Sequence, residues 1–552
     1  MNPRTDLDPL HFEVPDHTNW SRNNIAEALP GVCTALGFTF WFEPNNLGVL
    51  RGFRAVGACD RFEVKMPERP EEFLFGAFFG QAAINLSAQQ PFFDRVPMFS
   101  RSAMEEVMLS GEGDGAAAKS RWHTLRFEAP RLARMIWTAL GLPRKQAALR
   151  LLTERWWTLA VGDEKPRTIE GAVRTIVEAH DRFVGIMEIH MATGLIMGLL
   201  YARLARLAAM AGHPGFETKL VTGASGIDET EVLNGLWKVA HDQAGLDDFI
   251  GRYGFHGTAE GQISEPSWRE DPSLLESLID EMRRRPEDQS PVGLQRARER
   301  SRSEAEQAFL EPLPITQRLK ARFVVVLTRR FVQLRETSKA SFLRLIDAAR
   351  CAARELGNQL EQEGVLDSAQ DIHHLTLPEI ADPRLCDNPP ALREKIAGRI
   401  AQREKYLHVE LPFNFSGVPT PLKAQTLKQK PDETKPGDAE PDQTGIPKTL
   451  NGMGVSPGVI QGRVRVLTGP TGDARMESGE ILVCPTTDPS WAGLLMLASG
   501  AVVDMGGSLS HGAVVARELG IPCVMNTGNG SKMLRTGDTV RVDGSTGVVE
   551  VL

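Results

Sequence analysis

Residues 423–448, KAQTLKQKPDETKPGDAEPDQTGIPK, limit how this chain can fold more than any other feature, because they contain almost no apolar side chains. A segment of this composition cannot bury enough surface to offset the conformational entropy that ordering would cost. We therefore interpret it as a solvated, flexible linker. The linker predicts two folding units, a large one over 1–422 and a small one over 449–552.

The unit before the linker is expected to be mainly α-helical. Apolar residues recur at helical spacing, among many Arg, Glu and Ala residues, in the stretches 172–211, 228–250, 273–285, 292–310, 314–364 and 391–406. Charged residues interrupt the most apolar stretch, so we expect a buried helix there and not a membrane span. Between residues 36 and 87 the pattern also allows short strands.

The unit after the linker is expected to be a compact α/β domain. Its sequence contains short β-rich runs bounded by glycines, namely GRVRVL, GEILVCP, GAVVD, IPCVMN, DTVRVDG and GVVEVL. Helical stretches are expected near 489–498 and 512–519.

The composition excludes several classes of protein. The chain of 552 residues carries a formal net charge of −8, which argues against nucleic acid as the main partner. The polar start MNPRTDLDPLHFEVPDH lacks the apolar core of a signal peptide, so neither secretion nor a membrane is expected. The six cysteines form no CxxC pair, which favours a reducing cytoplasm over a disulfide framework or a zinc site.

His511 lies in a setting that suits phosphoryl chemistry. Gly506 and Gly507 allow backbone angles that other residues avoid, and Ser508 and Ser510 are small and can hydrogen-bond locally. His511 then precedes the run GAVVAREL, a helix start whose free N–H groups and dipole favour an anion. Imidazole is a good nucleophile near neutral pH and a good leaving group, as a reversible phosphoryl carrier requires. From the spacing alone, a helix cap or a surface histidine is the simpler explanation.

The stretch GGSLSHGAVVARELGIPCV (506–524) resembles the phosphohistidine signature of the mobile, swivelling domain in phosphoenolpyruvate-utilising enzymes. That family includes phosphoenolpyruvate synthase, pyruvate phosphate dikinase and rifampicin phosphotransferase. The resemblance continues through GVSPGVIQGRVRVL, ILVCPTTDPSW and GDTVRVDGSTGVVEVL and covers essentially all of 451–552. It implies that His511 is the phosphorylated residue. The residues that it assigns to the phosphohistidine loop and its helix are Gly506, Gly507, Ser508, Ser510 and Arg517.

A discontinuous resemblance to rifampicin phosphotransferase-like proteins runs over about 20–410. It rests on NWSRNNIAEALPGVCTALGFTFW, FFGQAAINLS, GFHGTAEGQISEPSWREDP, LRETSKASFLRLIDAAR and DIHHLTLPEI, which occur in the same order as in the family. It implies a region that binds the acceptor of the phosphoryl group. The chain departs from the family at Gln81, where Arg is common, and at Phe255-His256, where a His-Arg pair is common. Rifampicin itself is therefore not the expected acceptor.

Two modules of this family have no counterpart in the sequence, the phosphoenolpyruvate/pyruvate barrel and the ATP-grasp nucleotide-binding domain. The chain thus resembles the divided arrangement of phenylphosphate synthase, in which the nucleotide-binding and phosphohistidine parts are separate subunits. This resemblance implies a separate ATP-grasp partner, which would hold ATP and Mg²⁺ and would phosphorylate His511. No cofactor and no metal ion are expected to bind tightly to this chain itself.

Arg335 and Lys339 are the candidates for holding the phosphoryl group during transfer. They lie four residues apart on an expected helix and therefore share one face. Two cations there can bind a phosphoryl group, and the resemblance places them beside the transfer site, with Glu336 orienting its neighbours. A solvated basic stripe that pairs with Glu336 is the alternative.

Other polar residues are candidates for the acceptor site, together with Gln81. His256 and Glu260 are also four apart, and either could act as a general base for an acceptor hydroxyl; a structural turn is the alternative. The cluster of Trp20, Arg22 and Asn23 either lines a pocket or forms a helix start.

Four further histidines lie in settings that bear on function. His373 and His374 precede an apolar run, but no carboxylate or cysteine spacing supports a metal site, so a pocket-lining role for His373 is the prediction. His180 and His190 lie ten residues apart in the stretch 172–211, beside several methionines, and are interpreted as core residues.

The sequence therefore predicts a dikinase-type phosphotransferase chain in the cytoplasm. A mainly α-helical acceptor region would bind a small organic alcohol or phenol, and a C-terminal α/β swivelling domain would deliver the phosphoryl group on His511. The alternative is a non-catalytic phosphocarrier or regulatory protein. A pocket beside Arg335 and Lys339 would favour the enzyme, and a filled, flat face would favour the regulatory protein.

Overall fold

The computed structural model describes residues 8–23, 25–97, 125–162, 164–213, 215–221, 228–284, 286–287, 290–422, 449–469, 476–477, 479–487, 491–507 and 510–552. The expected linker 423–448 and Ser508 lie outside the described residues.

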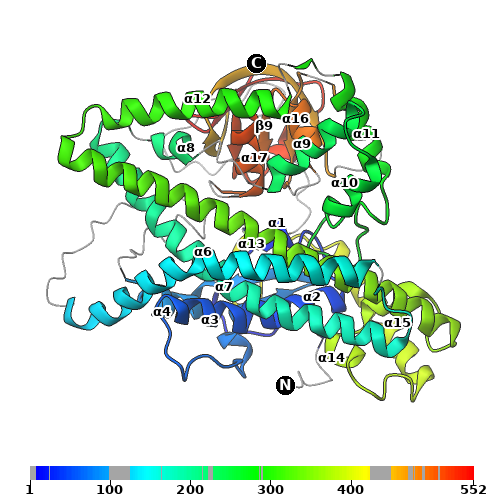
Figure 1. Cartoon of the computed structure of the whole chain (residues 1–552). Coiled ribbons are helices and arrows are strands. Elements are labelled where there is room, and N and C mark those ends of the chain that lie inside the picture. The colour runs from blue at the N-terminus through cyan, green and yellow to red at the C-terminus, as the bar shows by residue number, and fades with distance from the viewer. Residues whose placement is uncertain are drawn as a thin grey trace, which may run out of the picture.

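Two long antiparallel helices, α7 (Ile169–Met210) and α13 (Ile315–Gln362), form the frame of the molecule (Figure 1). The centroid of the Phe183 ring on α7 lies 5.4 Å from that of the Phe342 ring on α13. The C-terminal part of α7 packs on the N-terminal part of α13, as expected of an antiparallel pair. By length and composition α7 could also cross a bilayer, but most of its apolar window is buried inside the molecule. The expectation of a buried helix is confirmed.

A third long helix, α6 (Leu125–Val161), packs against both α7 and α13. It has no counterpart among the expected helices. Two prolines, Pro130 and Pro143, lie inside it, and large apolar residues such as Trp137 and Leu140 are exposed on it. Because apolar residues lie on more than one face of α6, its sequence lacks the clear helical spacing from which a helix is predicted.

The first unit also contains a small antiparallel sheet with the strand order β2-β3-β1-β4. Its strands are β1 (Asn19–Ser21), β2 (Phe75–Phe78), β3 (Gln81–Asn85) and β4 (Asn414–Ser416). Strand β4 pairs with β1, so the chain returns to its own beginning just before the linker. The region 36–87 thus contains strands, as the pattern allowed, but only at its end.

Short helices fill the space between this sheet and α7. They are α1 (Ile25–Ala28), α2 (Ala35–Glu43), α3 (Val49–Ala55) and α4 (Leu86–Phe93). Gly48 and Gly52 bring α3 directly onto α7, since a Cβ at either would lie under 3 Å from the Cβ of Met187 or Met191. This close packing holds α2 and α3 beside the middle of α7.

Five helices lie above α13 in Figure 1. They are α8 (Phe216–Val221), α9 (Asp228–Ala240), α10 (Leu246–Tyr253), α11 (Ser273–Arg284) and α12 (Pro291–Leu310). Helices α8 and α12 contact α13, and α10 and α11 pack on α9. The expected helix 228–250 is therefore two helices, with a turn at 241–245. Residues 369–374 form a 3₁₀ helix, followed by α14 (Leu377–Ile380) and α15 (Pro389–Leu407).

The residues after the linker form a mixed eight-stranded sheet with the order β5-β12-β11-β7-β8-β9-β10-β6. The strands are β5 (Thr449–Asn451), β6 (Met453–Ser456), β7 (Val459–Val466), β8 (Ile481–Cys484), β9 (Gly500–Val503), β10 (Cys523–Met525), β11 (Thr539–Asp543) and β12 (Val548–Val551). Strands β7 to β10 are parallel, with α16 (Ala492–Leu497), α17 (His511–Leu519) and α18 (Gly530–Met533) between or after them. The expected α/β character is confirmed.

This C-terminal domain packs against the helices of the first unit. Met496 of α16 belongs to the buried cluster that α9, α10 and α11 form, and α17 contacts α12. Lys532 of α18 donates a hydrogen bond of 2.7 Å to Glu410, which lies between α15 and β4. Figure 1 shows the domain, in orange and red, resting beside α9 and α12 and above α13.

Candidate functional site

A cavity of about 240 Å³ lies where α1, α2, α7, α13 and the docked C-terminal domain meet. Its apolar wall is made by Ile25, Ala28, Trp41, Val49, Leu74, Phe75, Ile84, Met187, Met191, Phe342 and Leu343. Its polar side chains are Glu27, Asn45, Gln89, His190, Glu260, Arg335, Glu336 and Lys339. The cavity thus combines a large apolar surface with a few charged groups, as small-molecule sites commonly do.

Three of the polar side chains come from one turn of α13. Arg335 Nη1 donates to Glu336 Oε1 at 3.0 Å, and the Glu336 carboxylate is almost fully buried. Lys339 lies one turn further on and is half-buried. Arg335 and Lys339 therefore both face the cavity, as their spacing indicated, and one of these cations is balanced by Glu336.

His190 of α7 faces the same two cations across the cavity. Its Nδ1 lies 2.8 Å from Ser338 Oγ, and its ring contacts Phe342 edge-on. Burial, and then the charges of Arg335 and Lys339, lower the pKa of His190 to about 3. The imidazole is therefore neutral at physiological pH.

Glu260 reaches the cavity from the loop between α10 and α11. His256 Nδ1 lies 2.5 Å from Glu260 Oε1, and both side chains are buried. The segment is a turn and not a helix, so the two residues meet through the loop and not across a helix face. Glu260 lines the cavity, whereas His256 lies behind it against the rings of Phe255 and Trp268.

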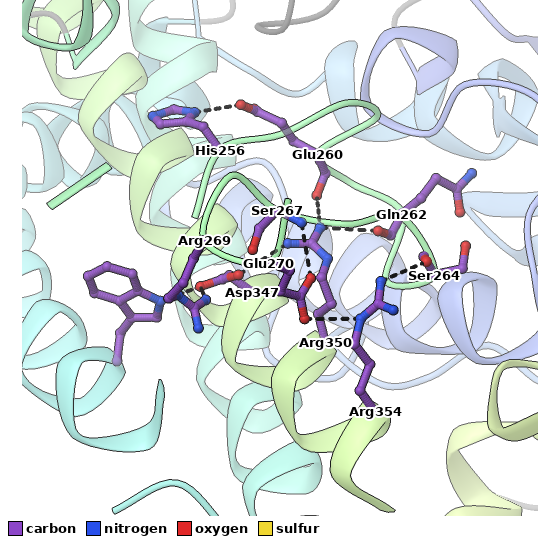
Figure 2. Close-up of polar contacts among 11 residues, drawn as sticks. His256, Glu260, Gln262, Ser264, Ser267, Arg269, Glu270, Asp347, Arg350 and Arg354 are labelled. Atoms are coloured by element: carbon purple, nitrogen blue, oxygen red, sulfur yellow. Dashed lines mark hydrogen bonds and ion pairs between the residues drawn. The ribbon is translucent and has the colours of Figure 1, made fainter. Parts of the chain in front are cut away.

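This loop is fixed to α13 by a buried ionic network, which Figure 2 shows. Arg350 donates to the carbonyls of Glu260 and Gln262 at 3.0 and 3.1 Å, and to Asp347 at 3.2 Å. Asp347, which is fully buried, also accepts from Arg269 and from the Trp157 indole. The network sets where the Glu260 carboxylate enters the cavity.

The same loop also contacts Trp41 and Ala28, which line the cavity. Trp41 Nε1 donates to the Gly261 carbonyl at 2.9 Å. A Cβ at Gly261 would lie 1.9 Å from the Ala28 carbonyl oxygen, so only glycine allows the loop to pass this close to α1.

The C-terminal domain closes the cavity with α17. His511 is the first residue of this helix, Ser510 caps it by accepting from Ala513 N, and Val514 lines the cavity. Gly506 has a φ of 138°, and a Cβ there would meet Met525 Sδ at 2.8 Å and Glu27 Oε1 at 3.1 Å. The glycine is thus required both by its backbone angle and by the close approach of the loop to α1. Arg517 is buried in the domain.

Three expected acceptor-site residues instead anchor the segment 409–413, which leads to the linker. Trp20 packs in a small apolar cluster with Leu411. Arg22 Nη1 donates to the Leu411 carbonyl at 3.2 Å, and Gln81 Nε2 donates to the Val409 carbonyl at 2.7 Å. None of the three lines the cavity.

Asn23 and His373 also lie outside the cavity lining. Asn23 is buried just before α1, and its N–H faces Ser21 Oγ at 3.4 Å. His373 is buried in the 3₁₀ helix beside Arg350 and Arg354, and burial lowers its pKa to about 3.

Several cavity residues were not singled out from the sequence. Trp41 and Glu27 lie in motifs that carry the family resemblance, but nothing local marks them as pocket residues. The apolar, methionine-rich sequence around His190 predicts a core residue. Its partner Ser338 lies almost 150 residues further along the chain, so no local pattern predicts their contact. Among the described residues, no group of three or more His, Cys, Asp or Glu side chains could hold a metal ion.

Two protein families match parts of this chain. The mobile domain of PEP-utilising enzymes matches residues 476–547, and the fourth domain of rifampicin phosphotransferase matches residues 196–336. The first match contains His511, and the second contains Arg335 and ends at Glu336. No ATP-grasp domain matches this chain.

Curated relatives resemble a little more than half of the chain. A prodigiosin synthesizing transferase, PigC of Serratia marcescens, is 30% identical over 56% of this chain and 33% of its own length. Rifampicin phosphotransferases of Streptomyces sviceus and Bacillus subtilis are 29% and 30% identical, over 62% and 55% of this chain and 38% and 34% of their own lengths.

The chain thus spans about a third of the length of the curated relatives that it matches. On these matches, and on the α/β fold of residues 449–552, the chain carries a PEP-utilising mobile domain behind a region related to the fourth domain of rifampicin phosphotransferase.

Proposed function

We propose that this chain carries a phosphoryl group on His511 and transfers it to the hydroxyl of a small organic alcohol or phenol bound in the cavity. A phosphotransferase of this kind is supported by the relatives named rifampicin phosphotransferase and by the mobile-domain match. The acceptor, its site and the donor are our own inference.

The observation that carries the proposal is the position of α17. Val514 lines the same cavity as Arg335 and Lys339, and helix positions 511 and 514 lie on neighbouring parts of one face. A phosphoryl group carried on α17 would therefore be delivered at this cavity, whose cationic side chains are Arg335 and Lys339. Arg335 and Lys339 would neutralise the charge on its oxygens, which is the main contribution a protein makes to such a transfer.

The cavity also indicates the size and chemistry of the acceptor. A dry cavity of ~150 Å³ is known to hold benzene, so about 240 Å³ accommodates a compact compound of one or two rings. Aromatic and methionine side chains would bind its apolar body, and the charged side chains would surround its hydroxyl.

We further propose that a separate ATP-grasp subunit loads His511. That subunit would bind ATP and Mg²⁺ and release AMP and phosphate, and the linker 423–448 would let the C-terminal domain swing between the two sites in the cytoplasm. This arrangement follows the resemblance to phenylphosphate synthase, in which the nucleotide-binding and phosphohistidine parts are separate subunits.

The cavity beside Arg335 and Lys339 favours the enzyme over a non-catalytic phosphocarrier or regulatory protein. A protein that only signals the phosphorylation state of His511 needs no internal space between the two units. Here the space exists, and residues of both units line it.

Intact-mass analysis under non-acidic conditions tests the proposal. The purified chain is incubated with ATP and Mg²⁺, with and without a co-expressed ATP-grasp protein. We expect an acid-labile phosphoryl gain that requires the partner and disappears in His511→Ala. A gain in His511→Ala would overturn the assignment of the carrier, and a gain without the partner would overturn the divided arrangement.

A further inference from the structure

Among the residues that line the cavity beside Arg335 and Lys339, His190 is the histidine. The proposed transfer needs such a group, because an acceptor hydroxyl must lose its proton as its oxygen bonds to phosphorus. The inference below rests on the proposed function.

The hydrogen bonds around Ser338 establish the tautomer of His190. The Ser338 hydroxyl donates its only proton to the Arg335 carbonyl at 2.7 Å. Its oxygen can therefore only accept from His190, whose Nδ1 lies 2.8 Å away. Nδ1 thus carries the ring proton, and Nε2 keeps its lone pair. A histidine whose Nδ1–H is held in this way is oriented to accept a proton at Nε2.

The three carboxylates of the cavity are less suited to this task. Glu336 binds Arg335, and Glu260 is held by His256. Glu27 lies under the Gly506 loop, where the C-terminal domain docks. Each of them would also bring a negative charge close to an incoming phosphoryl group, whereas neutral His190 brings none.

We propose that His190 is the general base that removes the proton from the acceptor hydroxyl. The acceptor oxygen attacks phosphorus and forms the O–P bond. The N–P bond of phosphorylated His511 breaks, and its electron pair returns to the ring nitrogen. The acceptor proton moves to Nε2 of His190, while Nδ1–H remains on Ser338.

The charge of the phosphoryl group makes this proton transfer favourable at the right moment. Burial, and after it the charges of Arg335 and Lys339, disfavour a charged imidazole at position 190. A bound phosphoryl group adds negative charge beside these two cations, so an imidazolium costs less when the donor is in place. His190 then gains basicity together with the arrival of its substrate.

The experiment uses the full chain with His511 loaded chemically by phosphoramidate, so that no partner is needed. Transfer is followed by loss of the phosphoryl mass and by ³¹P NMR of the ester. The acceptors are benzyl alcohol, phenol and 4-nitrophenol, at a mildly alkaline pH where 4-nitrophenol is already ionised. The variant is His190→Asn, whose amide N–H can replace the Nδ1–H donated to Ser338 but which has no base at the Nε2 position.

We expect His190→Asn to load normally and to slow transfer to benzyl alcohol by about 10²–10⁴-fold, as loss of a general base does. Phenol should be affected less, and 4-nitrophenol hardly at all, because it has no proton to lose. Added imidazole should restore part of the rate in His190→Ala. His180→Asn, on the same helix but outside the cavity lining, is the matched control.

Other outcomes would contradict the inference. If His190→Asn slows transfer equally for all three acceptors, or does not slow it at all, His190 is not the general base, and the proposed function is unaffected. A selective loss on benzyl alcohol in Glu260→Gln, without one in His190→Asn, assigns the base to Glu260 and overturns this inference. If the loaded wild-type chain transfers to none of the three, both the proposed function and this inference are overturned.

Discussion

At the scale of single residues, the proposed site offers positive charges that a phosphoryl group would need. Arg335 is paired with Glu336, and Lys339, one turn further along α13, is the second cation that lines the cavity. Burial, and after it the charges of Arg335 and Lys339, keep His190 neutral. Lys339 would therefore act on both the phosphoryl donor and the acceptor side of the proposed transfer.

We expect Lys339→Met to slow transfer from loaded His511 by about 100-fold, the size of effect seen when one transition-state donor is removed. The same change should raise the pKa of His190, because a positive neighbour is lost, but not to its ordinary value, because burial is the larger cause. Histidine NMR titration and the phosphoryl-mass assay measure the two effects. Lys320→Met, at an exposed position of the same helix, is the control. Equal rates in the two variants would contradict this role for Lys339.

At the scale of elements, the cavity depends on a loop that has no regular structure. The segment 254–272 is held by side chains of α13, above all by Asp347 and Arg350. Removing one partner of a buried ionic network leaves an uncompensated charge, which is costly. The stability of the loop is therefore concentrated in a few contacts on one helix.

We expect Asp347→Asn to lower the free energy of unfolding by about 3 kcal/mol, because Arg350 and Arg269 lose their buried counter-charge. Urea unfolding followed by tryptophan fluorescence measures this loss, and Trp157, which donates to Asp347 at 2.7 Å, should report it directly. Glu178→Gln, which removes only the exposed pair with Arg182, should cost less than about 1 kcal/mol. Similar losses in both variants would show that the network does not hold the fold.

At the scale of the whole molecule, function depends on how the C-terminal domain docks. Apolar contacts through Met496 and an exposed ion pair between Lys532 and Glu410 join it to the first unit. Such contacts are compatible with the proposed movement of this domain, since exposed ion pairs contribute little to stability.

We expect Lys532→Glu to reduce the transfer rate by at most about fivefold, because an exposed pair contributes no more than ~1 kcal/mol. The double variant Glu410→Lys with Lys532→Glu should restore the rate, since it reverses the pair without removing it. The effect should shrink at high salt, where exposed charges are screened. Loading of His511 by phosphoramidate is the control and should not change. A double variant as slow as the single one would contradict this docking contact.

Local patterns in the sequence predicted much of this protein. The helical spacing of 172–211 and 314–364 matches α7 and α13, and the glycine-bounded runs after residue 449 match the strands of the C-terminal sheet. The motif around His511 identified the mobile domain. These features depend on residues within a few positions of one another, because periodicity, caps and turns act over short distances.

Only the tertiary structure decided which side chains share the cavity. Trp20 and Gln81 looked like pocket residues but hold the segment before the linker, whereas His190 looked like a core residue but faces Arg335 and Lys339. The physical reason is that a helix offers several faces, and packing decides which of them meets a cavity. This packing brings together segments that lie hundreds of residues apart in the sequence, so no local pattern predicts it.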